Sequence, residues 1–80
     1  MARIKTLTRV SGSSRPHPTA VDAEWSVVIA DGAARYFQLS TFGSEDRASA
    51  PKVSQTIQLD RNSALELRIA LEETFPEDFL

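Results

Sequence analysis

The sequence predicts a small α+β domain in which a four-stranded antiparallel sheet is followed by one C-terminal helix. Apolar and polar residues alternate over 35–42 and 52–59, which is typical of strands with one buried face. Asp31-Gly32 is a hairpin signal, and apolar residues recur with helical spacing over 61–74. We expect a meander with the helix packed on one face of the sheet.

The first part of the chain should supply the other two strands. Residues 3–10 are rich in Thr, Ile and Val, which favour a strand, and residues 25–30 form the next apolar run. Between them, residues 11–24 include one glycine and two prolines, so we expect a long loop. The sequence leaves open whether this loop becomes ordered on binding a ligand.

The pairing of the two central strands can be argued from their apolar residues. A two-residue loop (31–32) would place Trp25 opposite Gln38, whereas a three-residue loop (30–32) places Trp25 opposite Phe37. A shift of one residue turns every side chain to the other face, so the apolar match favours the longer loop. The expected core face is Trp25, Val27, Ile29, Phe37, Leu39, Val53, Ile57 and Leu59.

The opposite face of the sheet should be polar. It collects the alternate residues of the last two strands: Tyr36, Gln38, Ser40 and Phe42, then Lys52, Ser54, Thr56 and Gln58. An antiparallel sheet with one face on the core and one in water shows this alternation.

The helix is expected to begin after Asp60, a good N-cap, and to end before Pro76, leaving residues 76–80 as a tail. One apolar stripe should cover the sheet: Ala64, Leu67, Leu71 and Phe75. Leu65 and Ile69 form a second stripe, which a helix with one packing partner does not need. We predict that this stripe forms a homodimer interface; the alternative is that it touches the N-terminal loop.

Length and composition limit what the chain can be. Its 80 residues make a single domain (1–80) with a thin core, and the absence of cysteine excludes disulfides. No segment resembles a signal peptide or a membrane span, so a cytoplasmic protein is expected. The net charge is −2, but the first twenty residues carry four basic residues and no acid. This asymmetry could orient an anionic partner toward the sheet, or serve solubility alone.

The sequence has few residues that could catalyse a reaction or bind a metal or a phosphate. The single histidine, His17, lies between two prolines, and its spacing from Asp22 and Glu24 is poor for metal ligation. The glycines form no phosphate-binding loop. We therefore expect no catalytic residue, no metal and no cofactor.

The pattern from Arg35 to Leu71 resembles the positive-cofactor-four family of transcriptional coactivators and its small bacterial relatives. The shared features are an alternating strand, a loop with charge and proline, a strand that ends in Ile57-Gln58-Leu59, and an immediate helix. The resemblance implies four antiparallel strands, a homodimer joined through its helices, and binding of single-stranded nucleic acid on the outer sheet face. The basic residues that the family has before the triplet are replaced here by Gln55 and Thr56.

The sequence is consistent with two alternative functions. In the first, single-stranded DNA or RNA binds the polar face, with bases stacked on Tyr36 and Phe42. The phosphates would contact Lys5, Arg9, Arg35 and Lys52, and hydrogen bonds would come from Gln38, Ser40, Ser54, Thr56 and Gln58. In the second, the chain is a protein-interaction module that docks a partner through the helix stripe or an edge strand.

Overall fold

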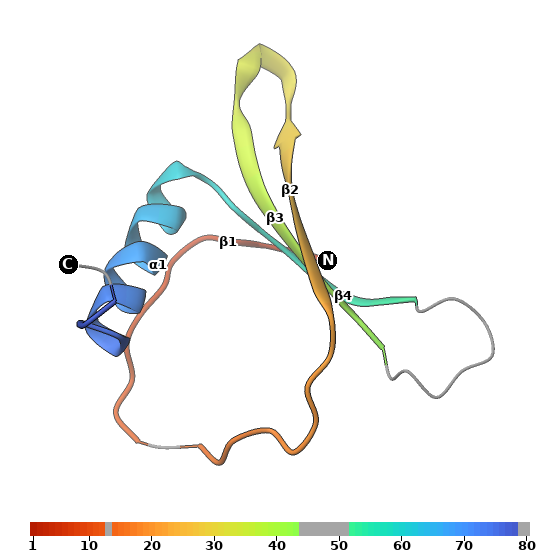
Figure 1. The fold of residues 1–80 in the computed structure, drawn as a ribbon. Coiled ribbons are helices and arrows are strands. Elements are labelled where there is room, and N and C mark those ends of the chain that lie inside the picture. The colour runs from red at the N-terminus through yellow and green to blue at the C-terminus, as the bar shows by residue number, and fades with distance from the viewer. Residues whose placement is uncertain (13, 44–51, 79–80) are drawn as a thin grey trace.

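A computed structural model describes residues 1–12, 14–43 and 52–78. Figure 1 shows a curved sheet with one helix at its side. The elements are β1 (Ala2–Ile4), β2 (Ala23–Ile29), a 3₁₀ turn (Asp31–Ala33), β3 (Arg35–Phe42), β4 (Val53–Leu59) and α1 (Arg61–Thr74). Within these described residues no helix is long and apolar enough to cross a membrane. Most of the loop expected before β4 lies outside the described residues.

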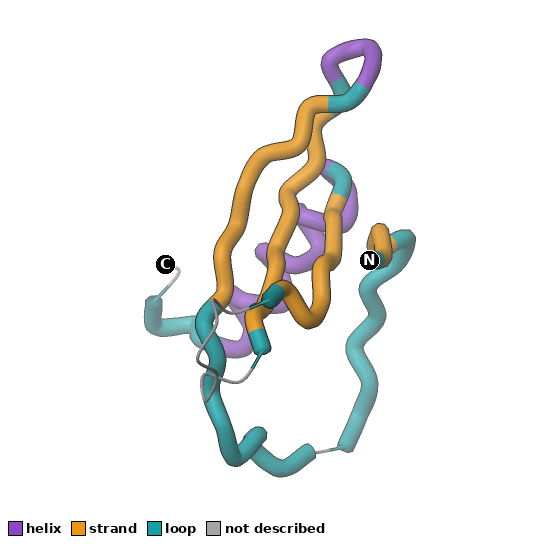
Figure 2. Tube along the Cα trace, turned by 90° about the vertical axis from the view of Figure 1, so that its right-hand side faces the viewer, coloured by secondary structure: helices purple, strands orange, loops and turns teal. Residues whose placement is uncertain are grey.

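The predicted α+β class with four strands and a C-terminal helix is confirmed, but the predicted meander is wrong. The strand order is β1-β4-β3-β2, and β1 pairs with β4 in parallel while the other pairs are antiparallel. It follows that β1 and β2 run in the same direction at opposite edges. Strands that run in the same direction cannot be joined by a tight turn. The chain between them therefore returns as a wide arch, visible in Figures 1 and 2.

The N-terminal strand is also shorter than predicted, because residues 5–10 leave the sheet and follow α1. The backbone N–H of Leu7 donates to Glu66 Oε2 at 3.3 Å, and Leu7 lines a shallow groove with Ile69. Ile4 and Leu7 have opposite parity, so the two could not both face the core of one strand, which agrees with this segment leaving the sheet. At the other end of the arch, β2 begins at residue 23, two residues before the predicted start.

The β2–β3 hairpin has a five-residue connection, so the predicted three-residue loop is wrong. Trp25 lies opposite Leu39, and the backbone N–H of Ala30 donates to Ala34 O at 2.8 Å. Gly32 has φ 74°, a left-handed conformation that glycine adopts without strain. The longer loop shifts the pairing by two residues, which leaves every side chain on its predicted face.

The N-terminus of α1 is built as the sequence predicts. Asp60 Oδ1 accepts the backbone N–H of Ser63 at 2.8 Å. Ser63 is 1% exposed, and its hydroxyl donates to the carbonyl oxygen of Ile4 at 3.0 Å. This bond ties the end of β1 to the first turn of the helix and gives the buried Ser63 hydroxyl a hydrogen-bond partner.

Asp60 predicts an acid-dependent loss of stability. The Ser63 backbone N–H holds the pKa of the Asp60 carboxyl below its ordinary value of 3.8. Because the folded pKa is the lower one, this stabilisation is complete well above pH 3.8 and disappears as the pH falls through the folded pKa. Asp60→Ala should lower Tm at neutral pH, and the difference from the unmutated chain should vanish in acid. Asp60→Asn, which caps without a charge, is the control: its Tm should lack this acid-dependent component.

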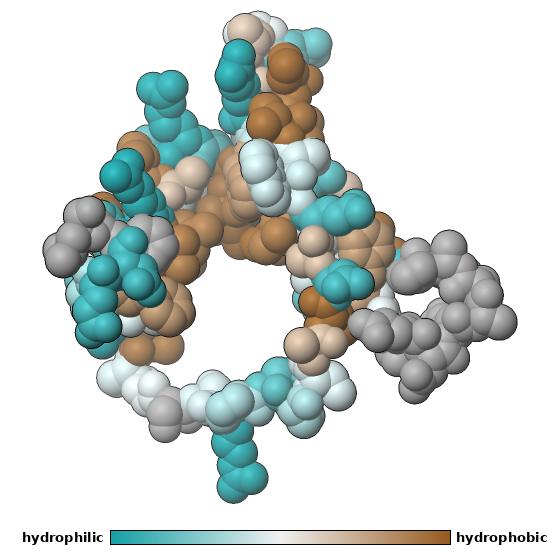
Figure 3. Space-filling model, in the orientation of Figure 1, coloured by the Kyte–Doolittle hydropathy of each residue, from teal (hydrophilic) through white to brown (hydrophobic). Residues whose placement is uncertain are grey.

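The predicted core face exists as a face, but most of it is not buried. Among the described apolar side chains Leu59 alone is buried, at 3% exposed. It lies beside Ile4 in β1 and Phe37 in β3. The fourteen residues of α1 span about 21 Å, which is too short to cover both the β4 end and the β2–β3 hairpin. The space-filling view shows an opening through the molecule with hydrophobic surface on its sheet side (Figure 3).

Candidate nucleic-acid interface

The sheet face opposite α1 carries two cross-strand pairs of uncharged polar side chains. Gln58 Nε2 donates to Gln38 Oε1 at 2.8 Å. One step along the same two strands, the hydroxyls of Ser40 and Thr56 lie 3.0 Å apart. All four side chains are half-buried, and their strand positions are directly opposite one another. We call this set the polar ladder; the predicted grouping of its four residues is confirmed.

A cation and an aromatic ring extend this face beyond the polar ladder. Arg3 Nη1 donates to the Tyr36 hydroxyl at 3.1 Å, and Arg3 Cζ lies 5.4 Å from the centre of the Tyr36 ring. This is a cation–π geometry, and it holds the guanidinium against the ring. Arg3 was not among the residues predicted to contact a ligand. It has the same parity as Lys5, which was, so the signal was present in the sequence.

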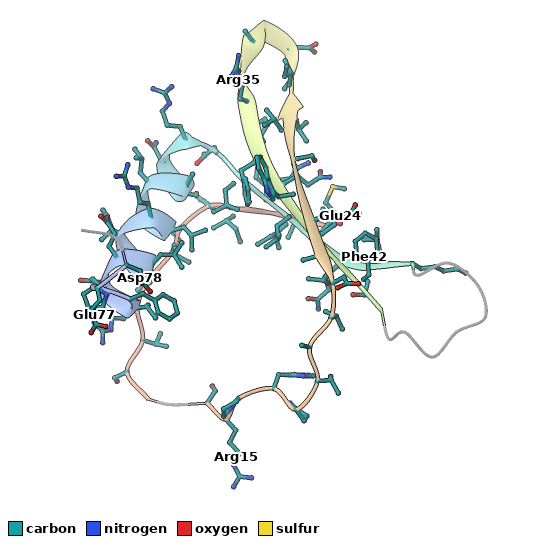
Figure 4. All side chains as sticks on the ribbon, in the orientation of Figure 1. Arg15, Glu24, Arg35, Phe42, Glu77 and Asp78 are labelled. Atoms are coloured by element: carbon teal, nitrogen blue, oxygen red, sulfur yellow. The ribbon has the colours of Figure 1, made fainter. Side chains whose placement is uncertain are left out.

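On the edge strand β2 this face carries Glu24, whose charge is opposite to that of Arg3. Glu24 lies opposite Ser40, and Ser26 lies opposite Gln38. Figure 4 shows Glu24 near the lower part of the sheet. A carboxylate at this edge repels phosphates, so the face has basic character at the β1 side and acidic character at the β2 side.

The other predicted site residues of β3 and β4 gather at the far end of these strands. Phe42 is half-buried and lies opposite Val53, after a shift in register at Thr41. The Ser54 hydroxyl lies 3.0 Å from Thr41 Oγ1, so Ser54 belongs to this irregular end and not to the polar ladder. Lys52 is exposed, and its carbonyl accepts the backbone N–H of Gly43 at 2.9 Å.

Tyr36 and Phe42 are six positions apart on one strand. At the rise of an extended chain their Cα atoms are separated by about 20 Å. Two aromatic rings at this spacing cannot hold the same base. They could instead mark the two ends of a path that runs along the polar ladder.

Three predicted phosphate contacts lie away from the polar ladder. Arg35 is opposite Ile29, on the same face as Trp25, and Figure 4 shows it near the hairpin end. Arg9 lines the groove beside α1, together with Glu66 and Glu73. Lys5 follows β1 directly and is exposed. Arg35 lies on β3 but on its other face, and Lys5 directly follows β1, the strand that carries Arg3.

His17 has a local structural role. Its Nδ1 accepts the backbone N–H of Thr19 at 3.2 Å, or in the other tautomer donates to Thr19 O at 2.9 Å. Across the parts of the chain that the structure describes, no three His, Asp or Glu side chains are close enough to hold a metal ion.

Comparisons of the chain with models of protein families, with curated proteins and with solved structures found no match. The resemblance described above therefore remains a prediction from the sequence.

Proposed function

We propose that this chain binds single-stranded nucleic acid, DNA or RNA, on the sheet face opposite α1. The observation that carries the proposal is the Tyr36 ring held beside the Arg3 guanidinium at one end of the polar ladder. Aromatic rings stack bases, guanidinium groups stack bases or bind phosphates, and both are sequence-tolerant contacts. DNA maintenance and transcription are the processes in which such a protein would act.

The polar ladder suits a ligand of mixed sequence. A glutamine amide has two N–H donors and a carbonyl acceptor, and the bond between Gln58 and Gln38 uses one donor and one acceptor. Donors and acceptors therefore remain on both residues. The hydroxyls of Ser40 and Thr56 can likewise donate or accept. A surface with both kinds of group can hydrogen-bond the edge of any base, so we expect weak sequence preference.

The first test is fluorescence anisotropy of a labelled single-stranded oligonucleotide of mixed sequence, titrated at several salt concentrations. We expect saturable binding that weakens as salt rises, because bound phosphates release counterions. The logarithm of the binding constant falls with the logarithm of salt by about 0.7 for each phosphate contact on single strands. With few cations on this face, a shallow slope is expected. An absence of binding at low salt would reject the proposal and leave the protein-interaction module.

Arg3→Gln tests the cation at the centre of the proposal. It should weaken binding at low salt and reduce the salt slope by about 0.7, because one phosphate contact is lost. Arg9→Gln is the matched control, since Arg9 lies beside α1 and should leave the slope unchanged. Equal effects of the two substitutions would show that net charge, not the polar face, determines binding.

We further propose that the protein works as a homodimer. Leu65 and Ile69, the second stripe of the helix, are 52% and 56% exposed. Ile69 lines the groove with Leu7, so the N-terminal segment does reach this stripe but does not cover it. A pair of chains could bind a longer single strand than one chain, because two polar faces would be linked.

A further inference from the structure

The β2–β3 hairpin presents a row of apolar side chains that nothing in the described structure covers. Trp25, Val27 and Ile29 alternate along β2 and are 67%, 55% and 69% exposed. We call them the hairpin row. The Trp25 ring stacks on Phe37 with ring centres 5.7 Å apart, so the row continues onto β3. Exposed apolar patches of this kind usually mark an interface.

A groove lies on the same face, between the hairpin and α1. Its volume is about 850 Å³. Val27, Phe37 and Leu59 line it from the sheet, and Ala64 and Leu65 line it from the helix. The charged residues Arg35, Asp60, Arg61 and Arg68 also line it. Each chain therefore carries an apolar ridge beside a groove whose lining is apolar with charged residues among it, and Val27 belongs to both.

The solvent-accessible surface area of the single chain is much larger than that of a compact monomer of the same mass. It measures 7300 Å². A compact monomer of 8.8 kDa exposes about 4,800 Å², so the excess is about 2,500 Å². The radius of gyration, 15.1 Å, likewise exceeds the roughly 12 Å of a compact domain of this length. The open arch and the uncovered apolar face both contribute to this excess.

We infer that a second copy of this chain covers the face, with the hairpin row of each chain seated in the groove of the other. An interface with two-fold symmetry uses the same patch on both chains, so that patch must contain both a ridge and its complement. The chain meets this requirement. The excess surface of two chains is about 5,000 Å², and if pairing buries half of it the interface has the size of an obligate homodimer's.

This inference rests on the proposal that the chain pairs with itself, and it extends the interface from the helix to the sheet. It leaves the polar ladder free, because the ladder lies on the opposite face. It requires no nucleic acid, so it is tested on the protein alone. Failure of the interface and failure of nucleic-acid binding are therefore separate results.

The first experiment uses the unmutated chain, in which Trp25 is the single tryptophan. Sedimentation equilibrium should give twice the chain mass of 8.8 kDa. Trp25 fluorescence should be blue-shifted and resistant to a soluble quencher, and dilution that dissociates the pair should reverse both. A monomer in sedimentation would overturn the inference. A dimer whose Trp25 is freely quenched would overturn the placement of the interface on the sheet.

The second experiment places a charge on each face of the same strand. Val27→Asp should abolish the dimer, giving monomers or unfolded chains. A side chain that is half-exposed in one chain would tolerate a charge unless a partner covers it. Leu65→Asp, across the groove, should have the same effect. Ser26→Asp is the matched control: Ser26 lies on the polar face opposite Gln38, so its dimer mass should be unchanged. A folded Val27→Asp dimer would contradict the inference.

Discussion

Tyr36→Ala is expected to weaken the binding of a single-stranded oligonucleotide about tenfold or more. Stacking of one base on an aromatic side chain contributes roughly 1–3 kcal/mol, and 1.4 kcal/mol corresponds to about a tenfold change in affinity. The substitution also removes the ring that holds Arg3. The measurement is the same anisotropy titration, at one fixed low salt concentration and with the oligomeric state of the variant compared with that of the unmutated chain.

Tyr36→Phe separates stacking from positioning. It keeps the ring but removes the hydroxyl that accepts from Arg3. If the ring stacks a base, Tyr36→Phe should retain most of the affinity. If the hydroxyl matters because it orients Arg3, Tyr36→Phe should lose nearly as much as Tyr36→Ala. A loss below twofold for Tyr36→Ala would remove Tyr36 from the site.

The second half of the fold could be predicted from the sequence because its determinants are local. Alternation places the side chains of β3 and β4 on the correct faces up to the register shift after Thr41, where Phe42 meets Val53. Asp60 with Pro76 sets the bounds of α1. The error in the hairpin loop did not change these faces, since it was a shift of two residues. A periodicity of two cannot detect such a shift.

The N-terminal half depended on contacts that no local pattern encodes. Residues 2–4 join the sheet beside β4, and the bond from Ser63 to the Ile4 carbonyl helps to hold them there. That bond links residues 59 positions apart in the chain. A serine in the first turn of a helix is ordinary, so its partner could not be inferred. The same placement brings Arg3 to Tyr36, which is why this pair was missed.

The grouping of polar residues on one face of the sheet was predicted correctly where strand pairing alone determines it. Gln38 with Gln58, and Ser40 with Thr56, follow directly from two adjacent antiparallel strands. Arg35 and Arg9 were selected for their charge, and charge does not determine which face a residue occupies. The burial of the apolar face was overestimated for a related reason. Periodicity predicts that residues share a face, but not that something covers it.

Leu59→Ala is expected to cause the largest loss of stability of any single truncation in the described part of the chain. Truncation of a buried leucine costs about 2–5 kcal/mol, from lost burial and from the cavity that remains. Domains have only about 5–15 kcal/mol in total, and a chain of 80 residues belongs near the lower end. Leu59 is where β1, β3 and the start of α1 meet, so no neighbour can move into the space without breaking strand pairing.

Val53→Ala is the matched control for this prediction. It removes an apolar side chain from the same strand, but Val53 is exposed in the single chain. Urea unfolding at one fixed protein concentration should show a clearly lower midpoint for Leu59→Ala and a small change for Val53→Ala. The protein concentration must be constant because pairing of chains would add to the apparent stability. If the two variants lost equal stability, burial within one chain would not be what distinguishes Leu59, and the second copy would supply most of the core.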